Sequence, residues 1–186
     1  LNSLVANTTG TENVAVGAGA LTANTTGSYN HAFGRNAGAA ITTGDTNIAI
    51  GNAALGTATT ADGNTAVGHS ALSANTSGSS NVGVGLNVLD ANTTGANNTA
   101  VGAASLGANT TGASNTAVGH NSLGNNITGN YNTALGYRAL TTTTAGNNTA
   151  VGHDALYLTT TGDANVAVGV GALDANTTGA NNTGLG

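Results

Sequence analysis

An asparagine recurs along the whole chain of 186 residues at a nearly constant interval. It stands at positions 13, 30, 47, 64, 81, 98, 115, 132, 148, 165 and 182, and every step is 17 residues except the 16-residue step from Asn132 to Asn148. Each asparagine begins one copy of N-T-A-V-G-x-x-A-L-x-A-N-T-T-G-x-x. A short fixed period indicates a solenoid or fibre in which each repeat packs on its neighbours. We therefore predict one array of about eleven coils over residues 1–186, with no separate domain for an active site.

We number the repeat from this asparagine, as positions 1 to 17. Position 2 is β-branched in ten of eleven copies, position 4 is always large and apolar, and position 5 is always glycine. Positions 2 to 4 therefore predict a short strand whose alternate residues face opposite ways. Glycine at position 5 and at almost every position 15 disfavours a helix. The fold class that follows is all-β, a repeat β-solenoid.

Position 3 carries only alanine or glycine, which indicates that another backbone approaches closely there. That backbone belongs either to the opposite wall of the same coil or to a neighbouring chain. We assign the row to packing between chains. Its members are Ala15, Ala32, Ala49, Ala66, Gly83, Ala100, Ala117, Ala134, Ala150 and Ala167.

The core is expected to be thin. The large apolar residue at position 4 and the leucine at position 9 are the only regular large apolar side chains of the repeat. Burying each contributes roughly 1.5–3 kcal/mol, against a backbone entropy cost of about 1–2 kcal/mol per residue. Ladders between coils and burial against partner chains must supply the difference, so we expect self-association.

The Asn-Thr-Thr-Gly segment at positions 12 to 15 predicts a strand end that runs into a turn. Stacked once per coil, its asparagines and threonines would form ladders that share hydrogen bonds along the axis. Eleven coils spaced by about 4.7–4.9 Å would give a rod roughly 50 Å long. We place the missing residue of the short step in the turn between Gly146 and Asn148.

Composition excludes several classes of function. The net charge is −5 and the only lysine or arginine residues are Arg35 and Arg138, so no basic patch can bind nucleic acid. The chain contains no run of 18 apolar residues, so the sequence predicts no membrane span, and no signal-peptide pattern is visible. Without cysteine there are no disulfides or thiolate metal sites. Both ends fall inside a repeat, so we expect a segment of a longer fibre.

The N-T-A-V-G-x-x-A-L-x-x-N-T-T-G unit resembles the repeat arrays of phage tail fibres. Its N-x-A-V-G part is similar to the N-S-V-A-I-G phrase of YadA-like heads of trimeric autotransporter adhesins. The resemblance covers the whole chain and implies a left-handed parallel β-roll, with three chains around a common axis and the Asn-to-Gly strand on the inner side. The 17-residue repeat is longer than the head-domain repeat and adds Asn-Thr-Thr-Gly.

Polar candidates for chemistry are sparse. His69, His120 and His153 share position 6, where a trimer could bring three copies of one histidine to a metal ion. Tyr137 and Arg35 occupy the same position, which favours solvent-facing decoration. The aspartates at positions 10 and 16 are too scattered for calcium sites and are expected to aid solubility. We predict no metal, no cofactor and no enzymatic activity.

A few large residues depart from the repeat: Tyr29, Tyr131, Tyr137, Tyr157, Phe33 and Arg35. Aromatic side chains on a polar rod are the most plausible contacts for a cell-surface glycan or a protein receptor, although repeat drift is the favoured explanation of these departures.

The resulting hypothesis is a non-catalytic, homotrimeric fibre segment, extracellular, on a virion or a cell surface. It would belong to a phage tail fibre or a bacterial surface adhesin and mediate attachment. One alternative is a structural filament or spacer without a ligand. A second is an ice-binding solenoid that presents a threonine ladder, and a single-chain solenoid is the structural alternative to the trimer.

Overall fold

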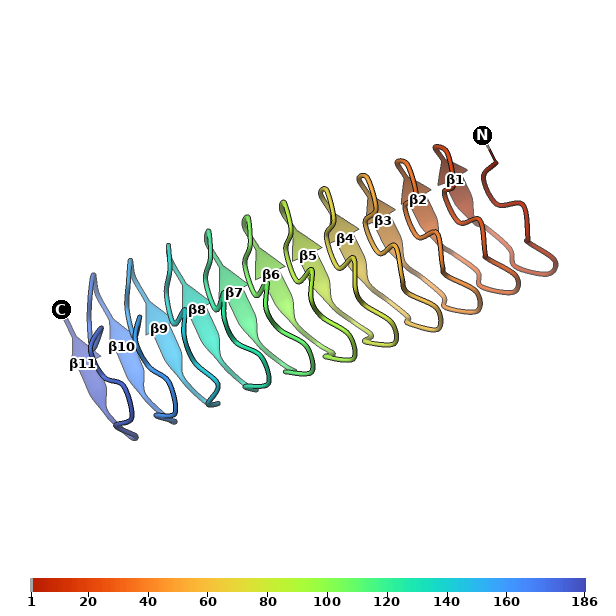
Figure 1. Ribbon diagram of the computed structural model, residues 1–186. Helices are drawn as coiled ribbons and strands as arrows, with labels where there is room; N and C mark the ends of the chain where they lie inside the picture. Colours follow the sequence, from red (N-terminus) through yellow and green to blue (C-terminus); the bar gives the residue numbers. More distant parts are fainter. Residues whose placement is uncertain (1) are drawn as a thin grey trace.

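The computed structural model describes residues 2–186 as a rod of stacked coils (Figure 1). Each coil contributes one strand of three residues, and the eleven strands pair in chain order into one parallel sheet. The described residues contain no helix. The predicted all-β parallel solenoid is therefore confirmed. The strands are β1 Val14–Val16, β2 His31–Phe33, β3 Ile48–Ile50, β4 Thr65–Val67, β5 Val82–Val84, β6 Thr99–Val101, β7 Thr116–Val118, β8 Thr133–Leu135, β9 Thr149–Val151, β10 Val166–Val168 and β11 Thr183–Leu185.

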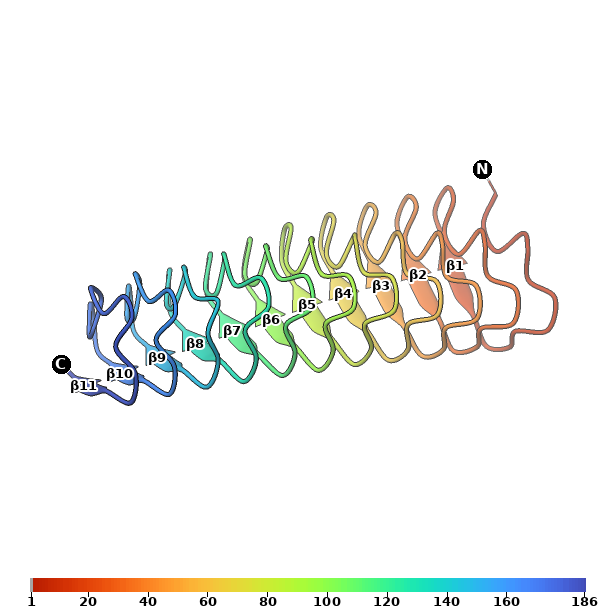
Figure 2. The same ribbon diagram turned by 60° about the horizontal axis from the view of Figure 1, so that its bottom comes forward.

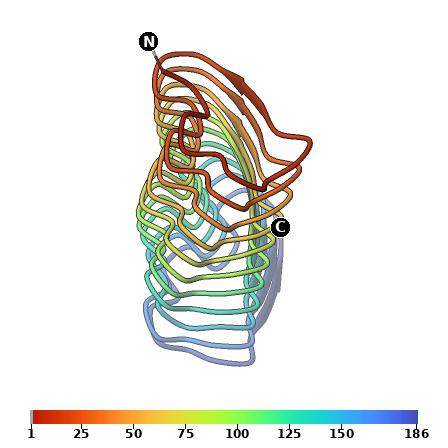
Figure 3. The same cartoon turned by 90° about the vertical axis from the view of Figure 1, so that its right-hand side faces the viewer.

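The register of the sheet follows the sequence repeat. Val14 pairs with His31 and Ala15 pairs with Ala32, each 17 residues further on, and the same offset continues along the rod. Only β8 and β9 differ, because Thr133 pairs with Thr149, 16 residues away. The strands lie along one wall of the rod (Figure 2), and a view turned toward the end of the rod shows the coils stacked as loops (Figure 3).

The burial of side chains on the two faces of the sheet contradicts two of the predictions. In β3, Ala49 is 1% exposed, whereas Ile48 and Ile50 are 37% and 41% exposed. The alanine row at position 3 thus points into its own coil, and the large residues at position 4 point outward. Assigning the alanines to packing between chains was wrong, and so was placing position 4 in the core. The residues concerned are Ala15, Ala32, Ala49, Ala66, Gly83, Ala100, Ala117, Ala134, Ala150 and Ala167, most of them fully buried.

The leucines at position 9 fill the interior opposite the alanines. Leu72 and Leu89 are fully buried, and both have positive φ, 52° and 50°. The left-handed conformation costs an L-residue about 1–2 kcal/mol, whereas burying a leucine contributes about 1.5–3 kcal/mol. Burial outweighs the strain, and this backbone turns the side chain inward. With leucine on one wall, the opposite wall has room only for alanine.

Two departures from the repeat compensate for each other inside the coil that follows β5. Gly83 replaces alanine at position 3, and Val88 replaces the usual small residue at position 8 of the same repeat. A Cβ on Gly83 would lie 3.2 Å from Cγ1 of Val88. The larger valine therefore occupies the space that the missing methyl group leaves.

The coil that follows β2 shows the same kind of exchange. Gly38 stands in place of the leucine at position 9, and Ile41 in place of the asparagine at position 12. Ile41 is 1% exposed, and a Cβ on Gly38 would lie 3.0 Å from its Cδ1. Ile41 fills the interior that leucine fills in the other coils.

The asparagines at position 1 form a buried ladder, which was predicted only for the asparagines and threonines of positions 12 to 15. The backbone N–H of Asn98 donates to Oδ1 of Asn81 at 3.0 Å. Its Nδ2 donates to the same oxygen at 3.2 Å and to the Gly112 carbonyl at 2.9 Å. Asn115 repeats both donations to Oδ1 of Asn98. An amide side chain both donates and accepts at this distance, which explains why position 1 never varies.

A second asparagine ladder runs through position 12 and is interrupted twice. Nδ2 of Asn92 donates to Oδ1 of Asn75 at 2.9 Å, and the pattern continues to Asn126. The ladder stops after Asn24 and after Asn126, because the next coils carry Ile41 and Thr143 at this position. Within the described chain, Oδ1 of Asn24 and Oδ1 of Asn126 are buried without a hydrogen-bond partner. The interruptions explain both unpaired oxygens.

The glycines at position 5, and most of those at position 15, lie where adjacent coils are in close contact. Gly34 at position 5 has φ of 139°, and a Cβ there would lie 2.5 Å from the Gly51 carbonyl oxygen. A Cβ on Gly27 at position 15 would clash with the Gly44 carbonyl oxygen of the next coil and would lie 2.6 Å from Oδ1 of Asn24 in its own coil. Position 15 nevertheless accepts alanine at Ala61 and Ala145, whereas position 5 is glycine in every coil.

The residue missing from the short repeat is position 14. We had predicted that the gap lies in the turn between Gly146 and Asn148. Nδ2 of Asn132 donates to the Ala145 carbonyl. In a full-length repeat the same bond runs to the residue at position 15, as from Asn98 to the Gly112 carbonyl. The N–H of Asn147 donates to the Asn130 carbonyl, the bond that position 17 makes to position 16 elsewhere. Ala145 therefore occupies position 15, and the missing residue falls between Thr144 and Ala145.

Candidate functional site

No enclosed site is present in the part of the chain that the structure describes. Residues 2–186 form no pocket, and they hold no group of three or more histidine, aspartate or glutamate side chains. The same residues include no helix that could cross a membrane. Candidate functional residues therefore lie on the outer surface of the rod.

The most extensive feature of that surface is the outward side of the sheet, here called the strand face. It consists of the side chains at positions 2 and 4 of β1 to β11. Position 4 is apolar in every strand, and position 2 is threonine, valine, isoleucine or His31. Val16, Val101 and Val168 are 55%, 38% and 40% exposed. A continuous uncharged strip of this kind is unusual on a protein that remains a monomer.

Around β2, four large side chains at alternate positions form a row along the strand, transverse to the rod axis. Tyr29, His31, Phe33 and Arg35 occupy positions 17, 2, 4 and 6, and all four are exposed. The alternation of the strand turns His31 and Phe33 outward, and the flanking turns place Tyr29 and Arg35 beside them. Three of the residues that depart from the repeat are thus brought together in one coil.

A comparable row crosses the rod at β8. Tyr131, Leu135 and Tyr137 are 66%, 48% and 45% exposed. Tyr131 is position 17 of the preceding repeat, and Leu135 and Tyr137 are positions 4 and 6 of the repeat that contains β8, as Tyr29, Phe33 and Arg35 are at β2. The two rows are six coils apart, so the structure does not bring Tyr29 and Tyr131 into one site.

The rings at position 6 stack along the rod axis near β8. The ring centroids of His120 and Tyr137 are 5.5 Å apart with an interplanar angle of 12°, and those of Tyr137 and His153 are 5.2 Å apart at 11°. The two imidazoles thus lie over opposite faces of the Tyr137 ring. The faces of the Tyr137 ring are thus covered, and its exposed edge remains for contact with a ligand.

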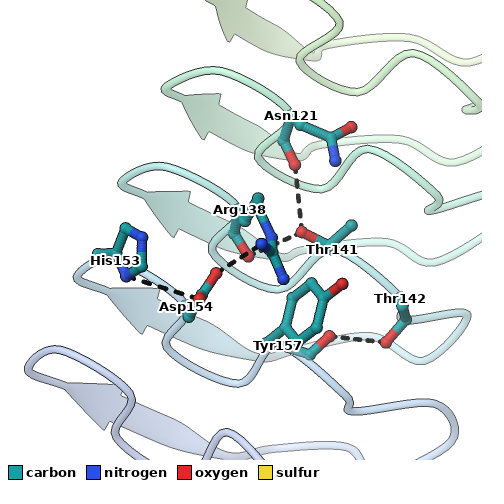
Figure 4. A network of polar contacts seen from close by, with 7 residues as sticks. All are labelled: Asn121, Arg138, Thr141, Thr142, His153, Asp154 and Tyr157. Carbon is teal, nitrogen blue, oxygen red and sulfur yellow. Dashed lines mark hydrogen bonds and ion pairs between the residues drawn. The ribbon is translucent and has the colours of Figure 1, made fainter.

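Beside this stack, Arg138 joins Tyr157 and Asp154 in a cluster (Figure 4). The guanidinium carbon lies 4.1 Å from the centre of the Tyr157 ring, a cation–π contact. Nε of Arg138 is 3.2 Å from Oδ1 of Asp154, and Nδ1 of His153 is 3.6 Å from Oδ2 of the same carboxylate. Tyr157, predicted as a surface contact, is half-buried beneath Arg138.

Electrostatic contacts keep Arg138 charged. Desolvation lowers the pKa of its guanidinium, but its hydrogen-bonding contacts with the side-chain oxygens of Tyr137 and Tyr157 and the charge of Asp154 raise it by more. Oδ1 of Asp154 is buried and accepts no aligned hydrogen bond within the described residues, so its contact with Arg138 is an ion pair. We did not predict this pair from sequence. The sequence feature that could have predicted the pair is that Arg138 and Asp154 both occupy position 7, in adjacent coils.

Two threonine hydroxyl groups anchor the coil that carries the cluster (Figure 4). Oγ1 of Thr141 donates to the carbonyls of Arg138 and Asn121, at 2.7 and 3.2 Å. Oγ1 of Thr142 donates to the Tyr157 carbonyl at 2.7 Å. These bonds lie in the 16-residue repeat, where the coil is one residue short. The two threonines thus tie the short coil to the backbone that carries the cluster.

The aspartates at position 16 belong to a ladder. Oδ1 of Asp45 accepts from the backbone N–H of Ser28 at 2.6 Å, and Oδ1 of Asp62 accepts from the N–H of Asp45 at 2.8 Å. Ser79 and Asn130 make the same contact with other coils. At position 10, burial raises the pKa of Asp90, and the backbone N–H groups of Asp90 and Ala91 offset part of this effect.

The threonine row at position 13 is also bound internally. Oγ1 of Thr8 donates to the Thr25 carbonyl at 2.9 Å, and Oγ1 of Thr93 donates to the Thr110 carbonyl at 3.0 Å. The hydroxyl protons of this row are therefore directed along the rod to the next coil. They are not free to donate to an ice lattice.

Comparison with family models, with curated proteins and with solved structures gives no match to this chain.

Proposed function

We propose that this chain is a non-catalytic segment of an extracellular fibre, in which copies of the chain associate through the strand face. The single observation that carries the proposal is the continuous, uncharged and largely apolar strip along all eleven strands. The favoured setting is a homotrimeric phage tail fibre or bacterial surface adhesin, as the resemblance of the repeat implies. Its role is attachment to a host or another surface.

The size of the strand face supports association between copies. Three-residue strands are about 10 Å wide, and ten steps of about 4.8 Å give a strip of roughly 500 Å² per chain. A stable interface buries about 800 Å² per partner. Apolar residues beside the strip, such as Leu86 and Val170 at 53% and 75% exposed, supply further area. A parallel arrangement around a common axis would cover the whole strip.

The role in attachment rests on the large side chains beside the strand face. Tyr29, Arg35 and Tyr131 extend from the edges of the strip and stay accessible if its centre is buried. Aromatic side chains supply large contact area with little loss of conformational entropy, and arginine is enriched among the residues that dominate binding energy at interfaces. In a fibre, each group is repeated once per chain, so weak contacts gain strength through multivalency.

The first experiment measures mass in solution by sedimentation equilibrium at micromolar concentration. A trimer is expected, and a stable monomer would contradict the proposal. Binding of the assembled protein to glycan arrays and to cell surfaces then tests attachment. An assembled protein that binds neither would leave a structural filament or spacer. Measurable thermal hysteresis would instead favour the ice-binding alternative.

A further inference from the structure

An interface built from nearly identical repeats does not by itself fix how two copies of the chain align along the rod axis. Four strands of the sheet, β4, β6, β7 and β9, have the same Thr-Ala-Val sequence. Between β4 and β11 position 2 is only threonine or valine, which have nearly the same shape, and position 4 is only valine or leucine. Two copies that slide by one coil would therefore meet almost the same surface. They would lose only the contact of one strand out of eleven.

Two adjacent strands break this uniformity. His31 and Phe33 in β2 and Ile48 and Ile50 in β3 are the largest outward side chains on neighbouring strands, and we call them the β2–β3 band. Phe33, Ile48 and Ile50 are 41%, 37% and 41% exposed, and His31 is also exposed. The inward residues of these two strands, Ala32 and Ala49, match the common repeat, and the interior of the β2 coil is filled by Ile41 and not by the outward side chains. The large residues therefore serve no purpose in the core of their own chain.

We propose that the β2–β3 band sets the axial register in which parallel copies of this chain assemble on the strand face. This inference rests on the proposed function. In register, Phe33 of each copy meets Phe33 of the others, and aromatic contacts form at one level of the fibre. A slip of one coil instead places Phe33 against Val16 or Ile50 and leaves the bulky residues mismatched in shape. A single distinctive residue sets the register of coiled coils in the same way.

The absence of cysteine allows a direct test by disulfide cross-linking. Three variants each carry one cysteine at position 2: Thr65→Cys, Thr116→Cys and Thr133→Cys. Pairs of variants are mixed, unfolded, refolded together, oxidised and analysed by mass. In-register parallel assembly places identical positions closest together and joins them preferentially. A Thr116–Thr133 product reports a slip of one coil, and a Thr65–Thr133 product reports antiparallel pairing of β4 with β8.

In the native background we expect the identical-position products to exceed the slipped product at least tenfold. The same mixtures are then made with the band returned to the common repeat by His31→Thr, Phe33→Val, Ile48→Thr and Ile50→Val. These side chains are exposed, so each chain should keep its fold, which circular dichroism checks. The slipped product should rise at least fivefold. The control Leu158→Ala removes an exposed apolar side chain outside the strand face and should leave the ratio unchanged.

The outcomes separate the two proposals. An assembled protein with equal amounts of slipped and in-register products contradicts the register inference and leaves the fibre proposal standing. An assembled band variant that keeps its register also contradicts the inference. A protein that sediments as a monomer and forms no cross-links contradicts the fibre proposal, and the register inference fails with it.

Discussion

The buried asparagine at position 1 illustrates how one residue type is selected by its hydrogen bonds. Asn98 is fully buried and takes part in five hydrogen bonds of the ladder, three as donor and two as acceptor. A carboxylate of the same shape would accept but not donate. It would also place a negative charge beside the Asn81 and Gly112 oxygen atoms. The ladder therefore depends on the amide group itself.

We expect Asn98→Asp to destabilise the fold by about 3 kcal/mol or more, because a buried charge replaces a satisfied amide. Thermal unfolding followed by circular dichroism measures the change. The neighbouring Asn97 is exposed at position 17, where Ser80 and Ser114 share its positive φ. Asn97→Ser should thus change stability by less than about 0.5 kcal/mol. Equal effects at the two positions would contradict the ladder interpretation.

At the residue scale, the pairing of Gly83 with Val88 gives a second prediction. Val88→Ala alone should cost about 1–2 kcal/mol, because it leaves a cavity in the core. Gly83→Ala alone should gain nothing, because the new methyl group is crowded by Val88 at 3.2 Å. The double variant restores the common repeat and should be close to the native protein. A double-mutant cycle should give a favourable coupling of about 1 kcal/mol, and additive effects would contradict the compensation.

The element that repeats is the coil, and its glycines control how closely coils stack. Gly34→Ala should destabilise the fold by about 2–4 kcal/mol, because φ is positive and the Cβ meets the Gly51 carbonyl. Gly107 is the matched control. A Cβ there meets its nearest atom at 3.3 Å, and position 10 carries alanine in another coil. Urea unfolding should show Gly107→Ala within about 0.5 kcal/mol of the native protein.

The short coil provides an element-scale test of where its missing residue lies. Insertion of a threonine between Thr144 and Ala145 restores position 14, and we expect stability within about 1 kcal/mol of the native value. Insertion between Gly146 and Asn147 should be markedly worse, because it displaces the N–H of Asn147 from the Asn130 carbonyl. Thermal unfolding of both variants decides the matter. The opposite order would return the gap to the turn before Asn148.

At the scale of the whole molecule, the rod leaves its most apolar surface uncovered by its own chain. We expect the double variant Val84→Glu/Val101→Glu to fold as a single chain and to remain monomeric. Each glutamate would face its own copies across the interface, where like charges repel and desolvation is costly. Leu158→Glu, outside the strand face, should leave assembly intact. Sedimentation equilibrium and circular dichroism compare the three proteins, and an assembled strand-face variant would contradict the proposal.

Much of this architecture could be predicted from the sequence. The recurrence of Asn30, Asn47 and Asn64 determined the coil length and the parallel register, because identical residues stack when the fold repeats at the same interval. Gly34 and its equivalents marked turns, and the asparagine and threonine rows predicted ladders. The strand at positions 2 to 4 was also predictable, since alternation puts Ala32 opposite His31 and Phe33. These features depend on residues near one another or one period apart.

Only the tertiary structure decided which side of the strand faces inward. Alternation separates Ala49 from Ile48 and Ile50, but it does not say which set is buried, and burial of the large residues was the natural expectation. The outcome depends on the leucine at position 9, whose left-handed backbone turns it into a narrow coil and leaves space for alanine alone. The pairs Gly83–Val88 and Arg138–Asp154 likewise follow from contacts across the coil or between coils. A local pattern sets the alternation of a strand, whereas its buried face is set by the volume that the rest of the coil leaves free.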